Sequence, residues 1–296
     1  MRRGGFDPLF FWLITLHYKL LYINKSEHGM GLTSQDGPAV WSSDEWIAYF
    51  KANANRLLTI PWEVEVLLSP EERALIAGSL PSWQLGESSD GVRLMASAQK
   101  HANSTNDPAF VEVMRMFIKE EQRHGGDLGQ FLDLADVPRK SWDWGDAVFR
   151  RVRHLVTHME LSCLVLITVE IHAMLYYASV RRVTTSEVLQ RICQQILRDE
   201  IPHIRFQCER LAILHHGRSR LLRWLTLTCH RVLFGGVTMA IWIGHRKVLR
   251  AGGFSFGRFW RTSWAKMGHA WQMMDPLKYQ WANPGLLALG VCRDLR

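Results

Sequence analysis

Two seven-residue stretches with nearly the same pattern constrain the fold of this chain more than any other feature. They are residues 118–124 and 197–203, and each consists of an apolar residue, a basic residue, two acids, two spacers and a histidine. Residues three apart lie on one face of an α-helix, so the second acid and the histidine of each stretch project side by side. The two pairs are Glu121 with His124 and Glu200 with His203.

A single Glu-x-x-His pair is usually a solvated charge pair, but a further acid precedes each pair by about the length of a helical hairpin. These acids are Glu87 and Glu170. The midpoint of the first interval falls in residues 103–108, which read as a turn followed by a helix start with an early proline. The midpoint of the second falls in residues 184–187, which have capping-box spacing. Two antiparallel helical hairpins would therefore place Glu87 opposite Glu121 and Glu170 opposite Glu200.

Glu170 lies in the middle of an almost wholly apolar run, residues 161–177. An unpaired carboxylate buried there would be costly, so it must be neutral, hydrogen-bonded or bound to a cation. Four carboxylates and two imidazoles converging inside a helical bundle describe a site for two metal ions, with iron or manganese favoured over zinc and calcium. The candidate metal ligands are Glu87, Glu121, His124, Glu170, Glu200 and His203.

This set of residues resembles the ferritin-like di-iron carboxylate superfamily, in which one Glu from each of two helices joins a Glu-x-x-His from each of two others. The segments 84–89 and 120–124 and the pair Asp199-Glu200 also look like a group of bacterial ferritin-like proteins of unassigned substrate. The resemblance covers roughly residues 69–216. It implies an all-α fold with a ferritin-like four-helix bundle, and a pair of iron ions or a manganese–iron pair.

Three further side chains gain an expected role from this resemblance. Metal-bound imidazoles usually donate their second N–H to a carboxylate. The resemblance therefore implies that Asp199 supports His124 across the bundle and that Glu120 does the same for His203, with solvent exposure as the alternative. Tyr177 lies two turns after Glu170 on the same face, where it either lines a substrate pocket, takes part in redox chemistry or simply fills the core.

Two features of the motif helices depart from ordinary helix composition. Pro202 lies between Glu200 and His203, where it removes a backbone hydrogen bond, so the sequence predicts a kink or a π-bulge there. Gly125 and Gly126 follow His124 directly, although each glycine costs about 1 kcal/mol relative to alanine in a helix interior. They indicate either a close approach of helices near the metals or tolerated local weakness.

The chain divides into three parts by pattern. Residues 1–40 form a poorly ordered or peripheral N-terminal segment that resembles a short signal peptide without a cleavage site. Residues 41–216 contain the bundle preceded by a short helix. Residues 217–296 form a C-terminal helical extension with helices expected at 221–243 and 258–274. The first of these is apolar enough for a membrane span, but its charged residues favour an amphipathic helix that packs on the bundle or touches a membrane.

Composition places the chain among globular proteins, with 47% hydrophobic and 22% charged residues over 296 residues. The net charge of +8 suggests an anionic substrate, RNA or a peripheral membrane contact, although a solvated basic surface is the favoured explanation. Five cysteines without Cys-x-x-Cys spacing indicate a reducing compartment. We therefore expect a cytoplasmic protein, with association with a membrane as the alternative.

The resemblance implies an O2-dependent oxidase or oxygenase that performs hydroxylation, desaturation or N-oxygenation on a small molecule. An external electron donor is expected, because the chain has no glycine-rich dinucleotide fingerprint and no cysteine cluster. Formation of an oligomer is compatible with this activity. The alternatives are a ferroxidase or other iron-handling protein, a tRNA-modifying hydroxylase, and a metal-free helical protein that binds RNA or a membrane.

Overall fold

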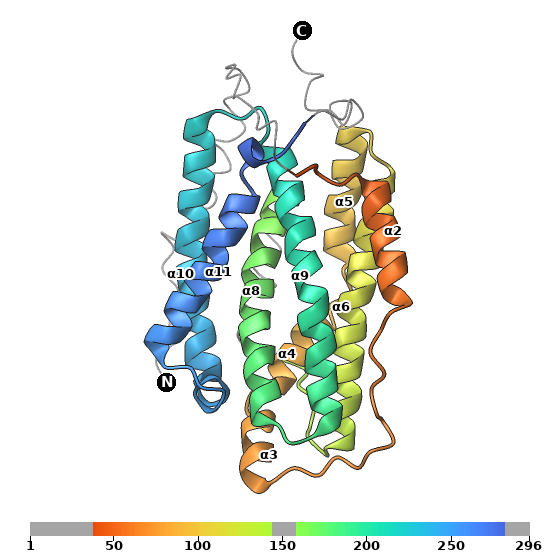
Figure 1. The fold of residues 1–296 in the computed structure, drawn as a ribbon, viewed down its shortest axis with the longest axis vertical. Helices are drawn as coiled ribbons and strands as arrows, with labels where there is room; N and C mark the ends of the chain where they lie inside the picture. The colour runs from red at the N-terminus through yellow and green to blue at the C-terminus, as the bar shows by residue number, and fades with distance from the viewer. Residues whose placement is uncertain (1–37, 144–157, 282–296) are drawn as a thin grey trace.

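The computed structural model of the protein describes residues 38–143 and 158–281. Within these residues the secondary structure is helical, apart from an isolated β-bridge between Ala39 and Gln280. The expected all-α class is therefore confirmed. The long helices run side by side along the longest axis of the molecule (Figure 1). Nearly all of the expected N-terminal segment, residues 1–40, lies outside the described residues.

Four helices pack around a common interior. Helix α5 packs against α6, α6 against α9, α9 against α8, and α8 against α5, so the contacts close a ring. Between the ends of these helices lie short connections, except between α6 and α8, where residues 144–157 are outside the described part. The bounds of the ring helices are Val92–Thr105 for α5, Ala109–Leu134 for α6, Met159–Val183 for α8 and Glu187–His215 for α9.

Three shorter helices precede the ring. Helix α2, Ser43–Ala54, packs against α6, and a capping box between Ser42 and Glu45 starts it. Helix α3, Pro70–Ala77, leads into α4, Leu80–Glu87, which also packs against α6. The bounds of these three helices set the position of Glu87, which is the last residue of α4.

A break at Gly91 separates α4 from α5. Gly91 has a φ of 67°, in the left-handed region that favours glycine, and a Cβ there would lie 2.7 Å from Cγ2 of Ile118. Both the backbone conformation and the close approach of α6 therefore require glycine. As a result Glu87 sits at a helix end rather than on a helix continuous with α5.

The two largest apolar clusters of the core lie on either side of the acidic and histidine residues. In α6, the first cluster includes Phe110 and Phe117, and the second includes Leu128 and Phe131. The Glu-x-x-His motif of α6 lies between these two pairs in the sequence. In α9 the order is reversed, with Ile192 and Ile196 of the second cluster before the motif and Phe206 and Leu211 of the first cluster after it. The polar residues therefore form a layer inside the helices, with apolar packing at both ends that limits access of water.

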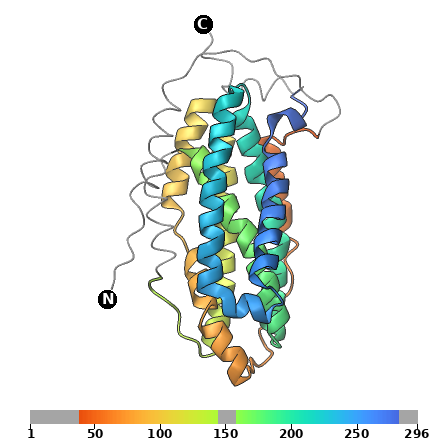
Figure 2. The same ribbon diagram turned by 90° about the vertical axis from the view of Figure 1, so that its left-hand side faces the viewer.

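Two helices follow the ring in the C-terminal extension. Helix α10, Arg220–Ala251, packs against α8 and α11, and α11, Phe256–Met273, packs against α8, α9 and α10. Figure 2 shows both helices covering one face of the molecule. A short 3-10 turn, Pro276–Lys278, then contacts α9 and α11. The expected first helix of this region is real but longer, because residues 244–251 continue it.

Two of the described helices are long and apolar enough to cross a membrane by length and composition. They are α8 and α10. Within the most apolar window of α8, 78% of residues are buried in the structure, whereas only 22% are buried in that of α10. Packing in the protein core accounts for the apolar composition of α8. It does not account for that of α10.

Candidate metal centre

The structure brings all six candidate ligands together. Glu87 comes from α4, Glu121 and His124 from α6, Glu170 from α8, and Glu200 and His203 from α9. They form two groups that share Glu121, and in each group one ligand atom per residue lies within 4.8 Å of the others. The members of the groups are Glu121, Glu170, Glu200 and His203, and Glu87, Glu121 and His124. These buried groups could hold metal ions.

The cluster is more open on one side than on the other. His124, Glu200 and His203 have no exposed surface. The side chain of Glu121 is 19% exposed, and Glu87 is also partly accessible. Solvent therefore reaches the cluster at Glu87 of α4 and Glu121 of α6, whereas the residues of α9 are closed off from solvent.

Both histidines have the same orientation. Nε2 of His124 lies 3.0 Å from Oδ2 of Asp199, and Nε2 of His203 lies 2.8 Å from Oε2 of Glu120. A carboxylate at this distance accepts the Nε2 proton, so Nδ1 of each ring faces the interior of the cluster. The contacts expected for Asp199 and Glu120 are both present.

Asn53 links the two supporting carboxylates. Its Nδ2 donates to Oε1 of Glu120 at 2.8 Å and to Oδ1 of Asp199 at 2.9 Å. Asp199 also accepts from Arg123 and Gln195. Burial alone would raise the pKa of Asp199, but the hydrogen bonds from its neighbours hold this pKa well below its usual range. Asp199 is therefore a fixed anion beside His124.

Several polar atoms that face the interior of the cluster have no hydrogen-bond partner. They are Oε1 of Glu121, Nδ1 of His124, both carboxylate oxygens of Glu200 and Nδ1 of His203. Nδ1 of His203 lies 2.9 Å from Oε1 of Glu121, but that contact lacks hydrogen-bond geometry. An unsatisfied buried polar group costs about 1–3 kcal/mol, so this set fits cations, which would bind all of these atoms.

The carboxylates of the cluster cannot all carry a negative charge without a compensating cation. Burial, reinforced by a neighbouring carboxylate, raises the pKa of Glu87, Glu170 and Glu200. Burial would also raise the pKa of Glu121, but His203 and His124 lower it to about 2. The cluster therefore holds protons where a metal site would hold cations.

Burial alone would lower the pKa of the His203 ring. The adjacent carboxylates of Glu120, Glu121 and Glu200 raise this pKa well above its usual range. A cation that binds Nδ1 must therefore displace a proton from this ring, and metal uptake releases protons to solvent.

Two neighbours reach the candidate ligands directly. The hydroxyl of Tyr177 donates to Oε1 of Glu87 at 2.7 Å, and Nε2 of Gln207 donates to Oε1 of Glu170 at 3.2 Å. Burial, together with the charge of Glu87, raises the pKa of Tyr177 far above its usual value, so the phenol keeps its proton. Tyr177 is thus both a core residue and a hydrogen-bond donor to the cluster. Neither Gln207 nor Asn53 was apparent from sequence spacing.

Of the two distortions expected at Pro202, a kink or a π-bulge, the π-bulge does not occur, since α9 is α-helical from Glu187 to His215. The missing N–H of a proline removes one hydrogen bond but does not require an extra residue in the turn. Glu200 and His203 therefore keep the three-residue spacing that puts both on the inner face of the helix.

Gly125 permits the close approach of α4 that the sequence suggested. A Cβ at this position would lie 2.7 Å from Oγ of Ser88, 2.9 Å from its backbone nitrogen and 3.0 Å from the carbonyl carbon of Glu87. A Cβ at Gly126 would meet nothing within 4 Å. The close approach is confirmed for the first glycine but not for the second.

These two glycines form a matched pair for a test. Gly125→Ala is expected to displace the Glu87 backbone, to lower stability by about 1–3 kcal/mol and to reduce metal content. Gly126→Ala should gain up to about 1 kcal/mol from helix propensity and bind metal normally. Denaturant unfolding and elemental analysis provide the measurements, and equal metal binding by the two variants would contradict the role given to Gly125.

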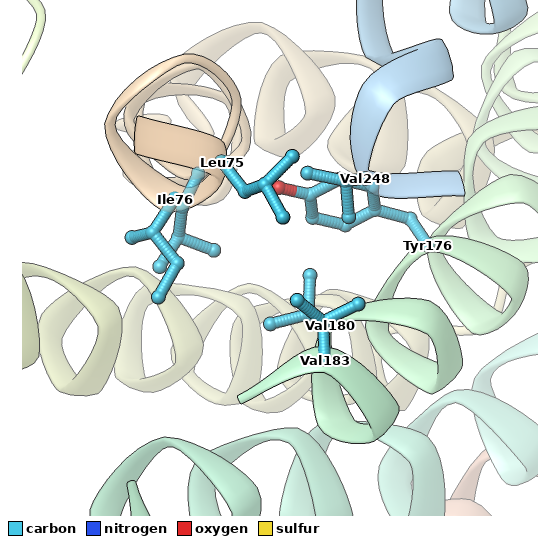
Figure 3. Close-up of a pocket in the computed structure, with 7 residues that line it drawn as sticks. Leu75, Ile76, Tyr176, Val180, Val183 and Val248 are labelled. Carbon is cyan, nitrogen blue, oxygen red and sulfur yellow. The ribbon is translucent and has the colours of Figure 1, made fainter. Parts of the chain in front are cut away.

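A small apolar cavity lies elsewhere, between α3, α8 and α10 (Figure 3). It holds about 10 Å³, which is room for about one water molecule at most. It contains none of the candidate ligands and is too small for an organic substrate. The residues that line it are Leu75, Ile76, Leu80, Tyr176, Val180, Val183 and Val248.

No family model matches this chain, and neither the curated proteins nor the solved structures contain a significant match. Fold and site therefore define the class of protein by themselves. It is an all-helical protein with a buried layer of carboxylates and histidines that could hold metal ions.

Proposed function

We propose that the ring of α5, α6, α8 and α9, with α4, is a ferritin-like four-helix bundle that binds two metal ions. The ions are a pair of irons or a manganese–iron pair, and the protein is an O2-dependent oxidoreductase. Glu121 belongs to both groups of ligand atoms. The proposal therefore assigns it to both ions, with Glu87 and His124 on one side and Glu170, Glu200 and His203 on the other.

The orientation of the two imidazoles is the observation that carries the proposal. Each ring donates a hydrogen bond from its Nε2–H to a buried carboxylate and turns an unpartnered Nδ1 toward the acids. Metal-binding histidines are typically held in this way. A purely structural cluster would instead leave several buried polar atoms unsatisfied at considerable cost.

The mixture of ligands favours iron or manganese. Zinc sites usually have four ligands or fewer, and calcium is bound almost entirely by oxygen. Carboxylates with one imidazole on each side suit divalent iron and manganese. The cluster also has two ligand groups rather than one, which is compatible with two ions.

Two such ions would supply the electrons that reduce O2, and the reaction would oxidise a small-molecule substrate by hydroxylation, desaturation or N-oxygenation. Asp199 and Glu120 keep both imidazoles in a fixed tautomer. The Tyr177 hydroxyl holds a proton at Oε1 of Glu87. The apolar clusters at both ends of the polar layer exclude water, which protects reactive species from side reactions.

Repeated turnover requires an external electron donor, since the sequence has no dinucleotide fingerprint or cysteine cluster of its own. The net charge of +8 is compatible with an anionic substrate or an acidic donor protein. Electrons from this donor would enter at the surface of the bundle.

Anaerobic loading with Fe(II), followed by exposure to O2, tests the proposal in wild type and in Glu170→Ala. The wild type is expected to bind about two ions per chain and to develop a near-ultraviolet charge-transfer band, whereas the variant should keep about one ion, at Glu87, Glu121 and His124, and lose most of the band. Glu65→Ala, at an exposed position in a loop, is the control. Equal spectra and iron contents in wild type and Glu170→Ala would remove Glu170 from the site and overturn the assignment.

The same experiment separates an oxidoreductase from an iron-handling protein. A ferroxidase that serves storage would continue to oxidise Fe(II) through many equivalents per chain and would form a large assembly. The proposed enzyme should stop after its own ions are oxidised unless a reductant is supplied. Native mass measurement of the loaded protein provides the second readout.

A further inference from the structure

Helix α10 exposes a stripe of large apolar side chains to solvent. Its buried face, against α8 and α11, carries the polar residues Thr226, His230 and Thr238 among apolar ones such as Phe234 and Trp242. Its outward face includes large apolar side chains that are 41–66% exposed. A helix on the surface of a soluble protein usually turns polar and charged side chains outward instead. The outward residues are Leu221, Trp224, Val232, Met239 and Ile243.

The inward polar groups of α10 are paired with groups on the neighbouring helices. Nε2 of His230 lies 2.9 Å from Oγ1 of Thr168, and Nδ1 of His230 accepts from the Trp271 indole at 3.1 Å. Nε2 of His172 lies 2.9 Å from Oγ1 of Thr238. These contacts fix the rotation of α10 about its axis. Its apolar side therefore faces outward as a consequence of specific polar contacts.

A polar residue near the outward face is also satisfied within the helix. The hydroxyl of Thr228 donates to the carbonyl oxygen of Trp224 at 2.8 Å. No acidic residue occurs between Leu211 and Met274, so the face has no negative charge that apolar surroundings would have to desolvate.

Basic residues surround this apolar face. They lie at both ends of α10, at Arg231 near its middle and along α11, which packs beside it. A surface that combines exposed apolar side chains with positive charge is complementary to an anionic lipid bilayer. The basic residues of the two helices are Arg220, Arg223, Arg231, Arg246, Lys247, Arg250, Arg258, Arg261 and Lys266.

We propose that the outward face of α10 binds flat on an anionic lipid bilayer. Its apolar side chains enter the boundary between headgroups and acyl chains, and the flanking arginines and lysines contact lipid phosphates. The proposal concerns a surface separate from the metal centre and is independent of the chemistry proposed for that centre.

The helix lies on the membrane rather than crossing it. Arg231 is exposed near the middle of α10 and stacks over the Trp271 ring at 5.0 Å. If α10 crossed the membrane, the Arg231 charge would lie in the hydrocarbon layer, which is costly. A second copy of the chain is also disfavoured as the occupant. It would bring two basic faces together with no acidic residue on α10 or α11 to compensate.

Co-sedimentation with vesicles tests the proposal on the full chain. Wild type is expected to bind vesicles of equal parts phosphatidylglycerol and phosphatidylcholine, and to bind phosphatidylcholine vesicles more weakly. The triple variant Trp224→Glu, Met239→Glu and Ile243→Glu should lose binding to the anionic vesicles by about tenfold or more. The charge is added to exposed positions, so the unfolding temperature and metal content should stay unchanged.

A control variant adds the same three charges elsewhere on the surface. Leu67→Glu, Val92→Glu and Leu134→Glu replace apolar residues that are 48–70% exposed outside α10. This variant should bind vesicles almost as well as wild type. Failure of wild type to bind anionic vesicles, or an equal loss in both triple variants, would overturn the proposal. So would a wild-type dimer that the α10 variant converts to a monomer without any change in vesicle binding.

Discussion

Glu121→Ala is expected to abolish binding of both metal ions, from about two per chain to nearly none. The reason is that Glu121 supplies a ligand atom to both groups in the cluster. Loss of any other candidate ligand leaves one of the two groups complete. Equilibrium dialysis against Fe(II) or Mn(II) without O2, followed by elemental analysis, measures the effect directly.

The control for this experiment lies on the same helix. Glu112 is in the first turn of α6, and its side chain is 41% exposed. Glu112→Ala should keep the full metal content, because its contact with Arg115 is a surface ion pair of small energy. Retention of two ions by folded Glu121→Ala would mean that Glu121 is not shared by two sites.

Glu200→Gln is expected to remove the ion of its own ligand group while making the metal-free protein more stable. Both carboxylate oxygens of Glu200 are buried without a hydrogen-bond partner. Burial and the adjacent Glu170 raise the pKa of Glu200 well above its ordinary value. An amide of the same shape has no charge to bury and can donate to a neighbouring carboxylate. We expect a gain of about 1 kcal/mol or more, which raises the Tm by about 2–4 °C.

The pH dependence has a definite sign. Because the pKa of Glu200 is higher in the folded state than in the unfolded state, its folded form binds the extra proton. The chelated wild type is therefore fully stabilised by this group below the unfolded pKa of about 4.3, and it loses that stability as the pH rises toward the folded-state pKa. Glu200→Gln should reduce this loss, as measured by thermal unfolding with excess chelator from pH 4 to 8.

Glu120→Gln is expected to destabilise the metal-free protein, although the chemical change is the same as in Glu200→Gln. The Glu120 carboxylate accepts hydrogen bonds from His203 and Asn53, so its neutral analogue should lower the Tm of the chelated protein. A structural role for the whole cluster would make both substitutions destabilising. A Glu200→Gln variant that is less stable than the chelated wild type would therefore count against a metal site.

The sequence predicted those parts of the centre that depend on local helix geometry. Three-residue spacing determines that Glu121 and His124 share a face, and the same holds for Glu200 and His203, whatever the surrounding structure. The meeting of the two Glu-x-x-His motifs with Glu87 and Glu170 could also be predicted. The repeated motif and the acid within an apolar run limit the arrangements that bury all of these groups at low cost.

Other features depended on tertiary contacts and could not be predicted. Asn53 belongs to α2, outside the ring, and only the docking of that helix brings it to Glu120 and Asp199. Gln207 lies one turn beyond His203 of α9, where it could equally have been an ordinary core amide. The break at Gly91 depends on contact with Ile118 of α6, and no local pattern indicates that contact.

The position of Asn53 has a consequence for how the two histidines behave. One amide group contacts the carboxylates that orient both rings, so the two sides of the cluster are not adjusted separately. A displacement of α2 would remove a hydrogen bond from both supporting carboxylates at once. A helix that contributes no ligand therefore couples the orientation of the two histidines, because it binds the supporting carboxylates of both.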